Sequence, residues 1–279
     1  MRNFLVMQTD FSLKSAAVSV MHGVSYQVDR DLVIEDISHE VLKWSPYAAS
    51  TNLAYTLPYW PAGTVFVSVV DPGVGTDRRA CVAKTKTGYY IVTPDNGTLT
   101  HVVREYGIEE VRVIDEAVNR YPGTEQINIF HGRDLFAYCG AKLASGKISF
   151  EEVGPAYDIS EIVLIDTPDA YEENGIIYGF NKTCNANFGI NVSNIPVELL
   201  DRIDVKLGDK VRLTVSHNGR IYFDEAVLYH RSFGYVAPGE PICYNAEGML
   251  LGFALNLENF MERYHTQPGP DWKVTLKKA

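Results

Sequence analysis

Short apolar runs and helix-like periods alternate along the first part of the chain. Residues 3–8 and 32–37 are predicted strands, the first of them buried. Residues 64–70 are a continuous β-branched segment, which is typical of a strand covered on both faces. Apolar residues at helical spacing separate them over residues 15–24 and 46–57. Strands that alternate with helices predict a mainly parallel sheet flanked by helices, an α/β domain.

The same alternation continues to about residue 165. The expected elements are a hairpin of 80–84 with 89–92, a helix over 99–106, a strand over 111–114 and a helix over 134–145. Gly107 and Gly146 directly follow the two helices, where glycine commonly ends a helix. We expect Asp134 to be the N-cap of the second of them.

The pattern changes in the last third of the chain. Residues 167–175 are polar and turn-rich, so we expect a linker between an N-terminal domain of residues 1–166 and a C-terminal domain of residues 176–279. Asn218-Gly219 is a strong hairpin signal. The expected strands are 175–180, 210–216, 219–223, 226–229, 241–244 and 249–254. This pattern predicts a smaller all-β, barrel-like domain.

Composition narrows the class of protein. Of 279 residues, 46% are hydrophobic and 22% charged, which argues against a disordered chain. The longest uncharged stretch that is mainly apolar, residues 51–70, contains two prolines and a glycine and is unsuited to cross a membrane. The net charge is 25 − 35 = −10 with no basic stripe, so neither nucleic acid nor a membrane is an expected partner.

The cysteines carry no metal or disulfide signature. Cys81, Cys139, Cys184 and Cys243 lie far apart, without the spacing of a metal-binding pair. No signal-peptide pattern opens the sequence. We therefore expect a cytoplasmic protein with reduced thiols, no metal and no cofactor.

Three groups of polar residues follow predicted strands. They are Asp10, the Asp-Pro-Gly-x-Gly turn from Asp71 to Gly75 with Arg78, and His131 between an apolar strand and a helix. Ligands of open α/β sheets bind at the carboxyl ends of strands. Two of these groups also have a structural interpretation: Asp71 can stabilise its own turn, and His131 can be a buried structural histidine.

Several common catalytic motifs are absent. No Gly-Lys-Ser/Thr follows the glycine-rich turn, no third glycine makes it a dinucleotide fingerprint, and no Gly-x-Ser-x-Gly elbow occurs. Two carboxylates, a guanidinium and an imidazole near one sheet edge can position a water or hold ribose hydroxyls. The residues alone therefore predict an enzyme that acts on a small molecule.

Four strings in order resemble one family. They are TDF at 9–11, VVDPGVGT at 69–76, TPDNG at 93–97 and FHGRD at 130–134, and the likeness continues at 188–189, 193–196, 235, 239–240 and 245–248. These strings resemble the S-adenosyl-L-methionine (SAM) hydroxide adenosyltransferases, SAM hydrolases that form adenosine and are relatives of the SAM-dependent fluorinase and chlorinase. The match covers nearly the whole chain.

The resemblance implies a fold, an assembly and a site. It implies a homotrimer with its site at the subunit interface, and an Asp71–Arg78–His131 set around a water that attacks ribose C5′ of SAM. Halogenating relatives lack the Asp and the His and have a Ser in place of Gly132. The implied substrate contacts are Asp10 to the ribose, Trp44 near the sugar, and Phe188 and Tyr235 on adenine. Trp44 can equally be a surface aromatic residue.

The methionine side departs from the family pattern. Asn185 stands where an Asp usually holds the methionine ammonium, and Ile190 stands where an Asn is usual. Asn191 is one residue away and can replace the lost amide. Ala246 replaces a Ser, and Glu247 can take over the ammonium. Two alternatives to SAM hydrolysis stay open: the same chemistry on another 5′-substituted adenosine, and a non-catalytic SAM- or adenosine-binding protein.

Overall fold

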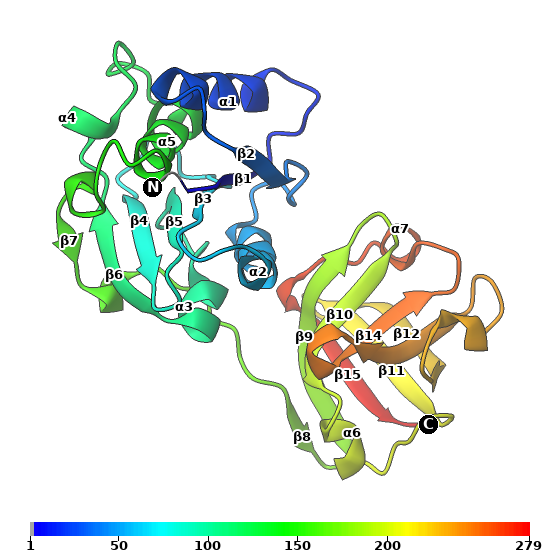
Figure 1. Ribbon diagram of the computed structural model, residues 1–279. Coiled ribbons are helices and arrows are strands. Elements are labelled where there is room, and N and C mark those ends of the chain that lie inside the picture. The colour runs from blue at the N-terminus through cyan, green and yellow to red at the C-terminus, as the bar shows by residue number, and fades with distance from the viewer. Residues whose placement is uncertain (1–2) are drawn as a thin grey trace. The chain divides into compact units, whose positions relative to one another are not determined.

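The chain folds into two compact units. The structure, a computed structural model, describes residues 3–279. The units are Met1–Ile165 and Asp166–Ala279, and each is described by itself (Figure 1). Strand β8 (Tyr171–Glu173) lies inside the stretch 167–175 and pairs with the strand that follows it, within the second unit.

The first unit is built on a seven-stranded mixed sheet. Its strand order is β2-β1-β3-β5-β4-β6-β7, and the pairings make β2, β1, β3, β5 and β6 point in one direction and β4 and β7 in the other. The strands are β1 (Leu5–Thr9), β2 (Ile34–Ser38), β3 (Val65–Val69), β4 (Ala80–Thr85), β5 (Tyr90–Pro94), β6 (Ile108–Val113) and β7 (Ala156–Tyr157). The prediction of a mainly parallel sheet is confirmed.

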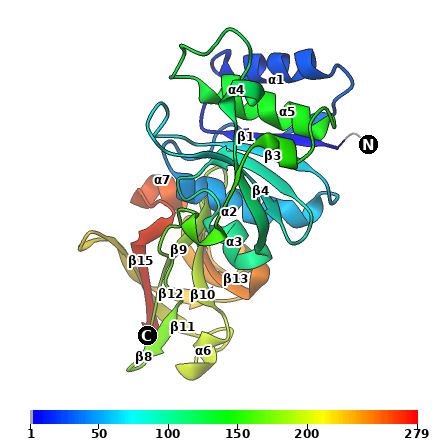
Figure 2. The ribbon, with the colours of Figure 1, turned by 90° about the vertical axis from the view of Figure 1, so that its left-hand side faces the viewer.

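Helices cover both faces of this sheet. Because side chains of a strand alternate between faces, Val65 and Val67 join one core cluster with α1 (Ala17–Val28) and α5 (Tyr138–Ala144). Phe66 points the other way and packs with α2 (Pro46–Thr56) and α3 (Thr100–Tyr106). Figures 1 and 2 show these two pairs of helices on opposite sides of the strands. The continuous apolar runs therefore mark strands covered on both faces.

The segment before α5 differs from its prediction. Residues 120–130 contain no strand, so His131 does not follow one. His131 instead opens a π-helical turn, η2 (Gly132–Ala137), that leads into α5. Asp134 lies inside this turn, fully buried, and is not an N-cap. A further short helix, α4 (Glu116–Asn119), precedes the segment.

The second unit is a closed β-barrel. Seven strands follow the order β10-β14-β13-β12-β11-β15-β9, and pairing of β9 with β10 closes the ring while β8 extends it. The strands are β9 (Ile176–Asn185), β10 (Ile190–Pro196), β11 (Lys210–His217), β12 (Arg220–Tyr229), β13 (Pro241–Ala246), β14 (Leu250–Leu255) and β15 (Gly269–Lys278). Short helices α6 (Leu199–Arg202) and α7 (Phe260–Tyr264) accompany them.

The barrel confirms the expected fold class and adds strands to it. Asn218 and Gly219 both have positive φ, as the tight turn between β11 and β12 requires. The two runs expected at 219–223 and 226–229 form the single strand β12, and β10 and β15 were not expected. Alternate residues of β11, Val211, Leu213 and Val215, are buried in the core of the barrel.

Two further findings concern the chain as a whole. Within residues 3–279, no helix is long and apolar enough to cross a membrane. The four cysteines are free thiols, and burial raises the pKa of Cys81 and Cys139 to about 12.

Candidate active site

Contacts with distant parts of the chain hold the loop after β3. The Asn96 side-chain amide donates to the carbonyl of Val70 at 2.9 Å, which fixes the end of the strand directly before Asp71. Gly75 has φ +77°, and a Cβ there would lie 2.7 Å from the carbonyl oxygen of Asn128. Glycine is therefore required at position 75 both for the backbone conformation and for the close approach of a neighbouring segment.

Asp71 and Arg78 form a buried, two-pronged ion pair. Arg78 Nε donates to Asp71 Oδ1 at 3.0 Å and to Oδ2 at 3.1 Å, and Nη2 donates to Oδ2 at 2.5 Å. The Asp71 and Arg78 side chains are only 4% and 10% exposed. The guanidinium also lies 5.2 Å from the centre of the Phe136 ring. Such a pair fixes the orientation of the carboxylate.

His131 lies between two arginines. Arg78 Nη2 is 2.9 Å from its Nδ1, and Arg120 Nη2 is 3.2 Å from its Nε2. A guanidinium only donates hydrogen bonds, and a neutral imidazole has one lone pair. Only one of the two arginines can therefore donate to the ring at a time.

The surroundings of His131 favour its neutral form. Burial lowers the pKa of His131 below its ordinary value of 6.5, and the positive charges of Arg78 and Arg120 lower this pKa further. Asp71 and Glu116 oppose the shift only in part. The imidazole is a neutral group at neutral pH and a poor acceptor of a proton.

Arg120 is the member of this site that the sequence did not indicate. Its Nη1 donates to the carbonyls of Thr124 at 3.2 Å and Ile127 at 3.1 Å, and its Nε donates to Glu116 Oε2 at 2.9 Å. These bonds leave the guanidinium little freedom beside His131. An arginine in an irregular segment has no periodicity or motif, so no sequence signal pointed to it.

Asp10 and Trp44 meet at the end of β1. The Trp44 backbone N–H donates to Asp10 Oδ2 at 2.9 Å, which orients one edge of the carboxylate. The Trp44 side chain itself is 74% exposed. This arrangement combines a held carboxylate with an accessible flat aromatic face.

Phe11 connects the Asp10 loop to the His131 turn. Its ring packs edge-on against Phe130. A Cβ on Gly132 would lie 2.9 Å from Phe11 Cε2, so the Phe11 ring fills the space that a side chain at 132 would need. Two of the three predicted groups of site residues, those of Asp10 and His131, therefore share a packed contact.

Two other motif residues have structural partners. Asp95 is buried and accepts hydrogen bonds from the Val163 N–H at 2.8 Å and the Tyr157 hydroxyl at 3.0 Å, and it pairs with Arg79. Asp134 pairs with Arg133. Asp95 thus connects Arg79, the neighbour of Arg78, to residues 157–163.

The second unit carries the residues expected to bind adenine and methionine. Asn185 Oδ1 accepts from the N–H groups of Asn187 at 3.1 Å and Phe188 at 3.3 Å, which closes the tip of the β9–β10 hairpin. The Phe188 ring at that tip is 70% exposed. Asn185 thus shapes the turn that presents Phe188.

Asn191 lies inside the barrel. Its side chain has no exposed surface, and its Oδ1 accepts from Asn181 Nδ2 at 2.8 Å and from the Thr266 hydroxyl at 3.1 Å. Contact with methionine would require this network to open.

Tyr235 and Glu247 lie on two further loops of the barrel. The Tyr235 ring is 52% exposed and stacks on the His230 ring with centroids 3.5 Å apart. Glu247 is exposed in the short turn η6 (Glu247–Met249). Both residues have accessible surface that a ligand or a neighbouring chain can cover.

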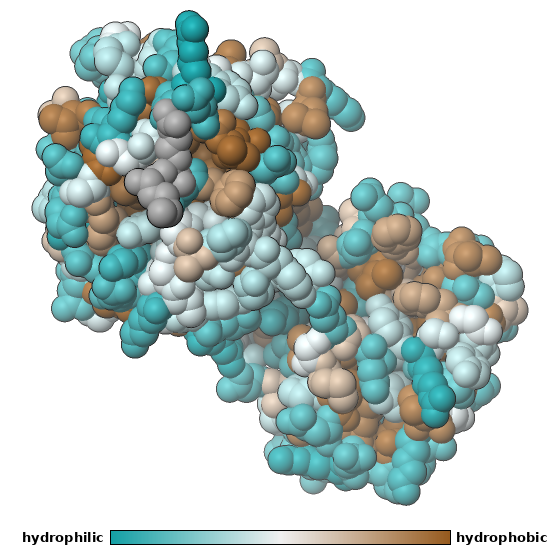
Figure 3. All heavy atoms as spheres, in the orientation of Figure 1, coloured by the Kyte–Doolittle hydropathy of each residue, from teal (hydrophilic) through white to brown (hydrophobic). Residues whose placement is uncertain are grey.

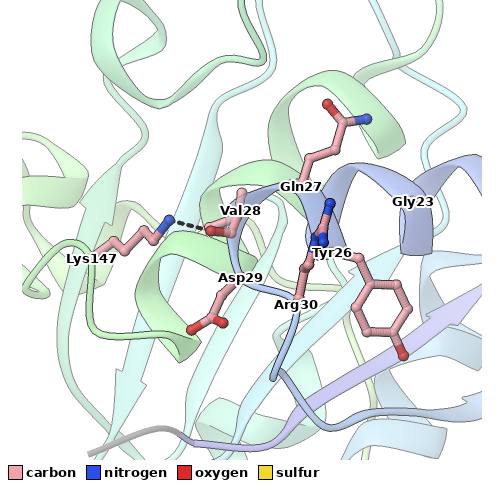
Figure 4. A pocket seen from close by; sticks show the side chains of 7 residues that line it. All are labelled: Gly23, Tyr26, Gln27, Val28, Asp29, Arg30 and Lys147. Atoms are coloured by element: carbon pink, nitrogen blue, oxygen red, sulfur yellow. Dashed lines mark hydrogen bonds between the residues drawn. The ribbon is translucent and has the colours of Figure 1, made fainter.

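A surface hollow lies elsewhere in the first unit. Tyr26, Gln27 and Arg30 line it at the end of α1, and the Lys147 ammonium donates to the Val28 carbonyl beside it (Figure 4). Its residues lie at or directly after the end of α1, apart from Lys147, whereas Asp10 and Asp71 follow the carboxyl ends of β1 and β3. It contains none of the predicted site residues.

Comparison with known proteins identifies the class. Residues 5–154 match the SAM hydroxide adenosyltransferase N-terminal domain, and residues 187–273 match the C-terminal domain of the same family. The crystal structure of a conserved protein from Thermotoga maritima superposes with a TM-score of 0.84 at 31% identity, over 99% of this chain and 100% of that chain. The chain belongs to the SAM hydroxide adenosyltransferase family.

Individual relatives point to one branch of the family. The (R)-S-adenosyl-L-methionine hydrolase of Salinispora tropica is 30% identical over 268 residues, 96% of this chain and 95% of the relative. The protein of that name from Methanocaldococcus jannaschii is 31% identical over 215 residues, 75% and 74% of the two chains. A fluorinase from Actinopolyspora mzabensis is 23% identical over 297 residues, 98% and 97% of the two.

Proposed function

We propose that Asp71, Arg78 and His131 hold the water with which this protein hydrolyses SAM to adenosine and L-methionine. The reaction follows from the family and from relatives at about 30% identity that are named SAM hydrolases. The single observation that supports these residues is the buried chain of contacts from Asp71 through Arg78 to His131. Position 132 is a glycine, whereas the halogenating relatives have a Ser there.

Methionine is a good leaving group in SAM, because its sulfur is a sulfonium. Its sulfonium accepts the electrons of the C5′–S bond and leaves as a neutral thioether, so no acid is needed there. The water oxygen forms the new bond to C5′ from the opposite side. What the protein supplies is alignment of that water, which lowers the barrier by several kcal/mol.

Asp71 is the group that we assign to the water. Arg78 donates only one hydrogen bond to Oδ1 but two to Oδ2, so Oδ1 keeps a lone pair for a water O–H. As the C–O bond forms, the water proton passes to this carboxylate and then to solvent. His131 is neutral beside two arginines, so it orients Arg78 and the water and does not store the proton.

The remaining residues bind the two halves of the substrate. Asp10 accepts the two ribose hydroxyls, with Trp44 against the sugar. Phe188 and Tyr235 cover adenine, since a flat apolar face suits aromatic side chains. Around the methionine we assign Glu247 to the ammonium and Asn185 to the hairpin tip beside it. Asn191 supports that tip from inside the barrel.

We further propose a homotrimer with the site at the subunit interface. Each unit exposes large apolar side chains next to its proposed site residues, such as Ile129 in the first and Met249 in the second. Apolar side chains are visible among polar ones on the surface of both units (Figure 3). Where such side chains join into one contiguous apolar patch, the patch is typical of an interface. We place the reaction in the cytoplasm, where the four free thiols stay reduced.

Chromatography of SAM incubations tests the proposal. The purified protein is expected to release adenosine and methionine in equal amounts, and His131→Ala is expected to release them far more slowly. Turnover of another 5′-substituted adenosine with SAM a poor substrate would move the function to that compound. Thermal stabilisation by SAM without any adenosine would show a binding protein instead.

A further inference from the structure

Two histidines and a carboxylate converge beside the first two strands. His22 comes from α1, Asp36 from β2, and His39 from the residue after β2. One ligand atom from each side chain lies within 4.8 Å of the others. None of the three belongs to the site proposed for SAM.

Both histidines direct the same ring atom at the same oxygen. His22 Nε2 and His39 Nε2 each lie 3.0 Å from Asp36 Oδ1. The two rings are inclined at 65° with their centroids 6.3 Å apart. Two nitrogens thus converge on one carboxylate oxygen, one from α1 and one from the end of β2 that also carries Asp36.

The buried histidine gives a second, independent indication. The His39 side chain is only 2% exposed, and its Nε2 makes no hydrogen bond although Asp36 Oδ1 is at contact distance. Its other nitrogen, Nδ1, is 2.8 Å from the Thr9 hydroxyl oxygen. If Nδ1 donates to Thr9, Nε2 presents a buried lone pair toward the cluster. A buried acceptor without a donor is costly, and a bound cation removes that cost.

We propose that His22, Asp36 and His39 bind a divalent transition metal of the zinc class, with water completing its coordination. Two imidazoles and one carboxylate suit Zn²⁺, whereas Mg²⁺ and Ca²⁺ prefer oxygen ligands only. The contact of His39 with Thr9 is the outer partner that fixes the ring of a metal-binding histidine.

A bound ion would link three elements of the first unit. It joins α1 to β2 and, through His39, to Thr9, which precedes Asp10 in the chain. The competing arrangement is a proton-linked His–Asp–His cluster, in which Asp36 accepts from both rings. Only the first arrangement predicts stoichiometric metal binding, so a binding measurement distinguishes the two.

The test uses the full-length, untagged protein after treatment with a chelator. Titration with Zn²⁺ is followed by equilibrium dialysis with elemental analysis, and titration with Co²⁺ by its visible absorption. One ion per chain is expected, and Zn²⁺ is expected to raise the melting temperature. Binding is expected to weaken on acidification, because protons compete with the metal ion for its ligands.

Two variants and a control localise the ion. His22→Ala and Asp36→Asn are expected to lower Zn²⁺ affinity at least tenfold and to abolish the rise in melting temperature. Both changes fall on partly exposed side chains and alanine suits a helix, so the variants are expected to fold. His217→Ala, which removes a histidine stacked on Trp272 in the barrel, is expected to bind as the parent does.

Two outcomes would overturn the proposal. One is less than stoichiometric binding of both Zn²⁺ and Co²⁺ by the folded protein. The other is binding that His22→Ala and Asp36→Asn leave unchanged, which would assign the ion to another place.

Discussion

The residues assigned to the water in the first unit and those assigned to adenine in the second differ sharply in exposure. In the first unit, Asp71 and Arg78 are 4% and 10% exposed and bonded to each other. In the second, Phe188 and Tyr235 are 70% and 52% exposed. The groups assigned to the water are therefore oriented by the chain itself, and the groups assigned to adenine offer surface that a ligand can cover.

This difference separates two kinds of contribution to catalysis. A buried ion pair that loses one partner leaves an uncompensated charge, which costs about 3–5 kcal/mol of folding stability. An exposed aromatic ring costs the fold little when it is truncated. Changes in the first set are thus expected to affect turnover and stability together, and changes in the second set to affect substrate binding alone.

The largest effect is expected from Asp71→Asn. The amide keeps the size of the side chain but removes the charge that orients the water, so kcat is expected to fall about a thousandfold. The rate of adenosine release at saturating SAM concentration measures kcat. Asp224→Asn is the matched control, because Asp224 forms a two-pronged pair with Arg212 on the barrel surface. An equal loss of kcat in both variants would contradict the assignment.

A smaller effect is expected from Arg120→Gln. Loss of this guanidinium frees the His131 ring, and kcat is expected to fall about tenfold to a hundredfold. It also removes a charge that lowers the pKa of His131, so the acid limb of the pH–rate profile moves to higher pH.

Arg112→Gln is the control for Arg120. Arg112 also donates to two carbonyls, of Glu151 and Gly154, and pairs with a glutamate, but it does not contact His131. Its variant is expected to lose stability without a shift of the pH profile. A shift of equal size in both variants would show that Arg120 acts only through folding.

The low pKa of His131 also makes stability depend on pH. The folded pKa lies below the ordinary value of 6.5, so the unfolded chain binds the proton more readily. This contribution to the free energy of unfolding is full above pH 6.5 and is lost as the pH falls through the folded pKa. Denaturant titrations are expected to show that acidification lowers the free energy of unfolding less in His131→Gln than in the parent protein.

Gly132→Ser tests the contact that joins the Asp10 and His131 loops. A new Cβ would lie 2.9 Å from the Phe11 ring, so a destabilisation of about 1–3 kcal/mol is expected, with a higher KM as Phe11 displaces Asp10. Gly23→Ala in α1 meets nothing within 4 Å and is expected to stabilise the protein slightly. Thermal unfolding and KM of each variant measure both effects.

The smallest effect is expected from Phe188→Ala. Removal of an exposed ring leaves the fold intact and is expected to raise KM several-fold, about 1 kcal/mol of binding, with kcat nearly unchanged. Ile221→Ala removes another exposed apolar side chain of the barrel and is expected to change neither constant. A large loss of kcat in Phe188→Ala would contradict the assignment of Phe188 to substrate binding alone.

Local patterns predicted much of the fold. The apolar runs of β1 and β3, the turn at Asn218-Gly219 and the glycine that follows α3 each depend on nearby residues. The strand β10 was missed because two of its buried positions are the polar residues Asn191 and Ser193. The strand β15 was missed although Trp272, Val274 and Leu276 alternate with polar residues as in a strand with one buried face. The N-cap expected at Asp134 was wrong because η2 begins earlier, at Gly132.

The sequence by itself determined the alternation of strands and helices, the change to an all-β region near residue 165, and the motifs that contain Asp10, Asp71, Arg78 and His131. Only the tertiary structure decided which side chains touch. Arg78 and His131 are 53 positions apart, and His22 meets Asp36 and His39 only where α1 packs beside β2. Such contacts depend on how distant elements pack, and neither periodicity nor local propensity encodes that.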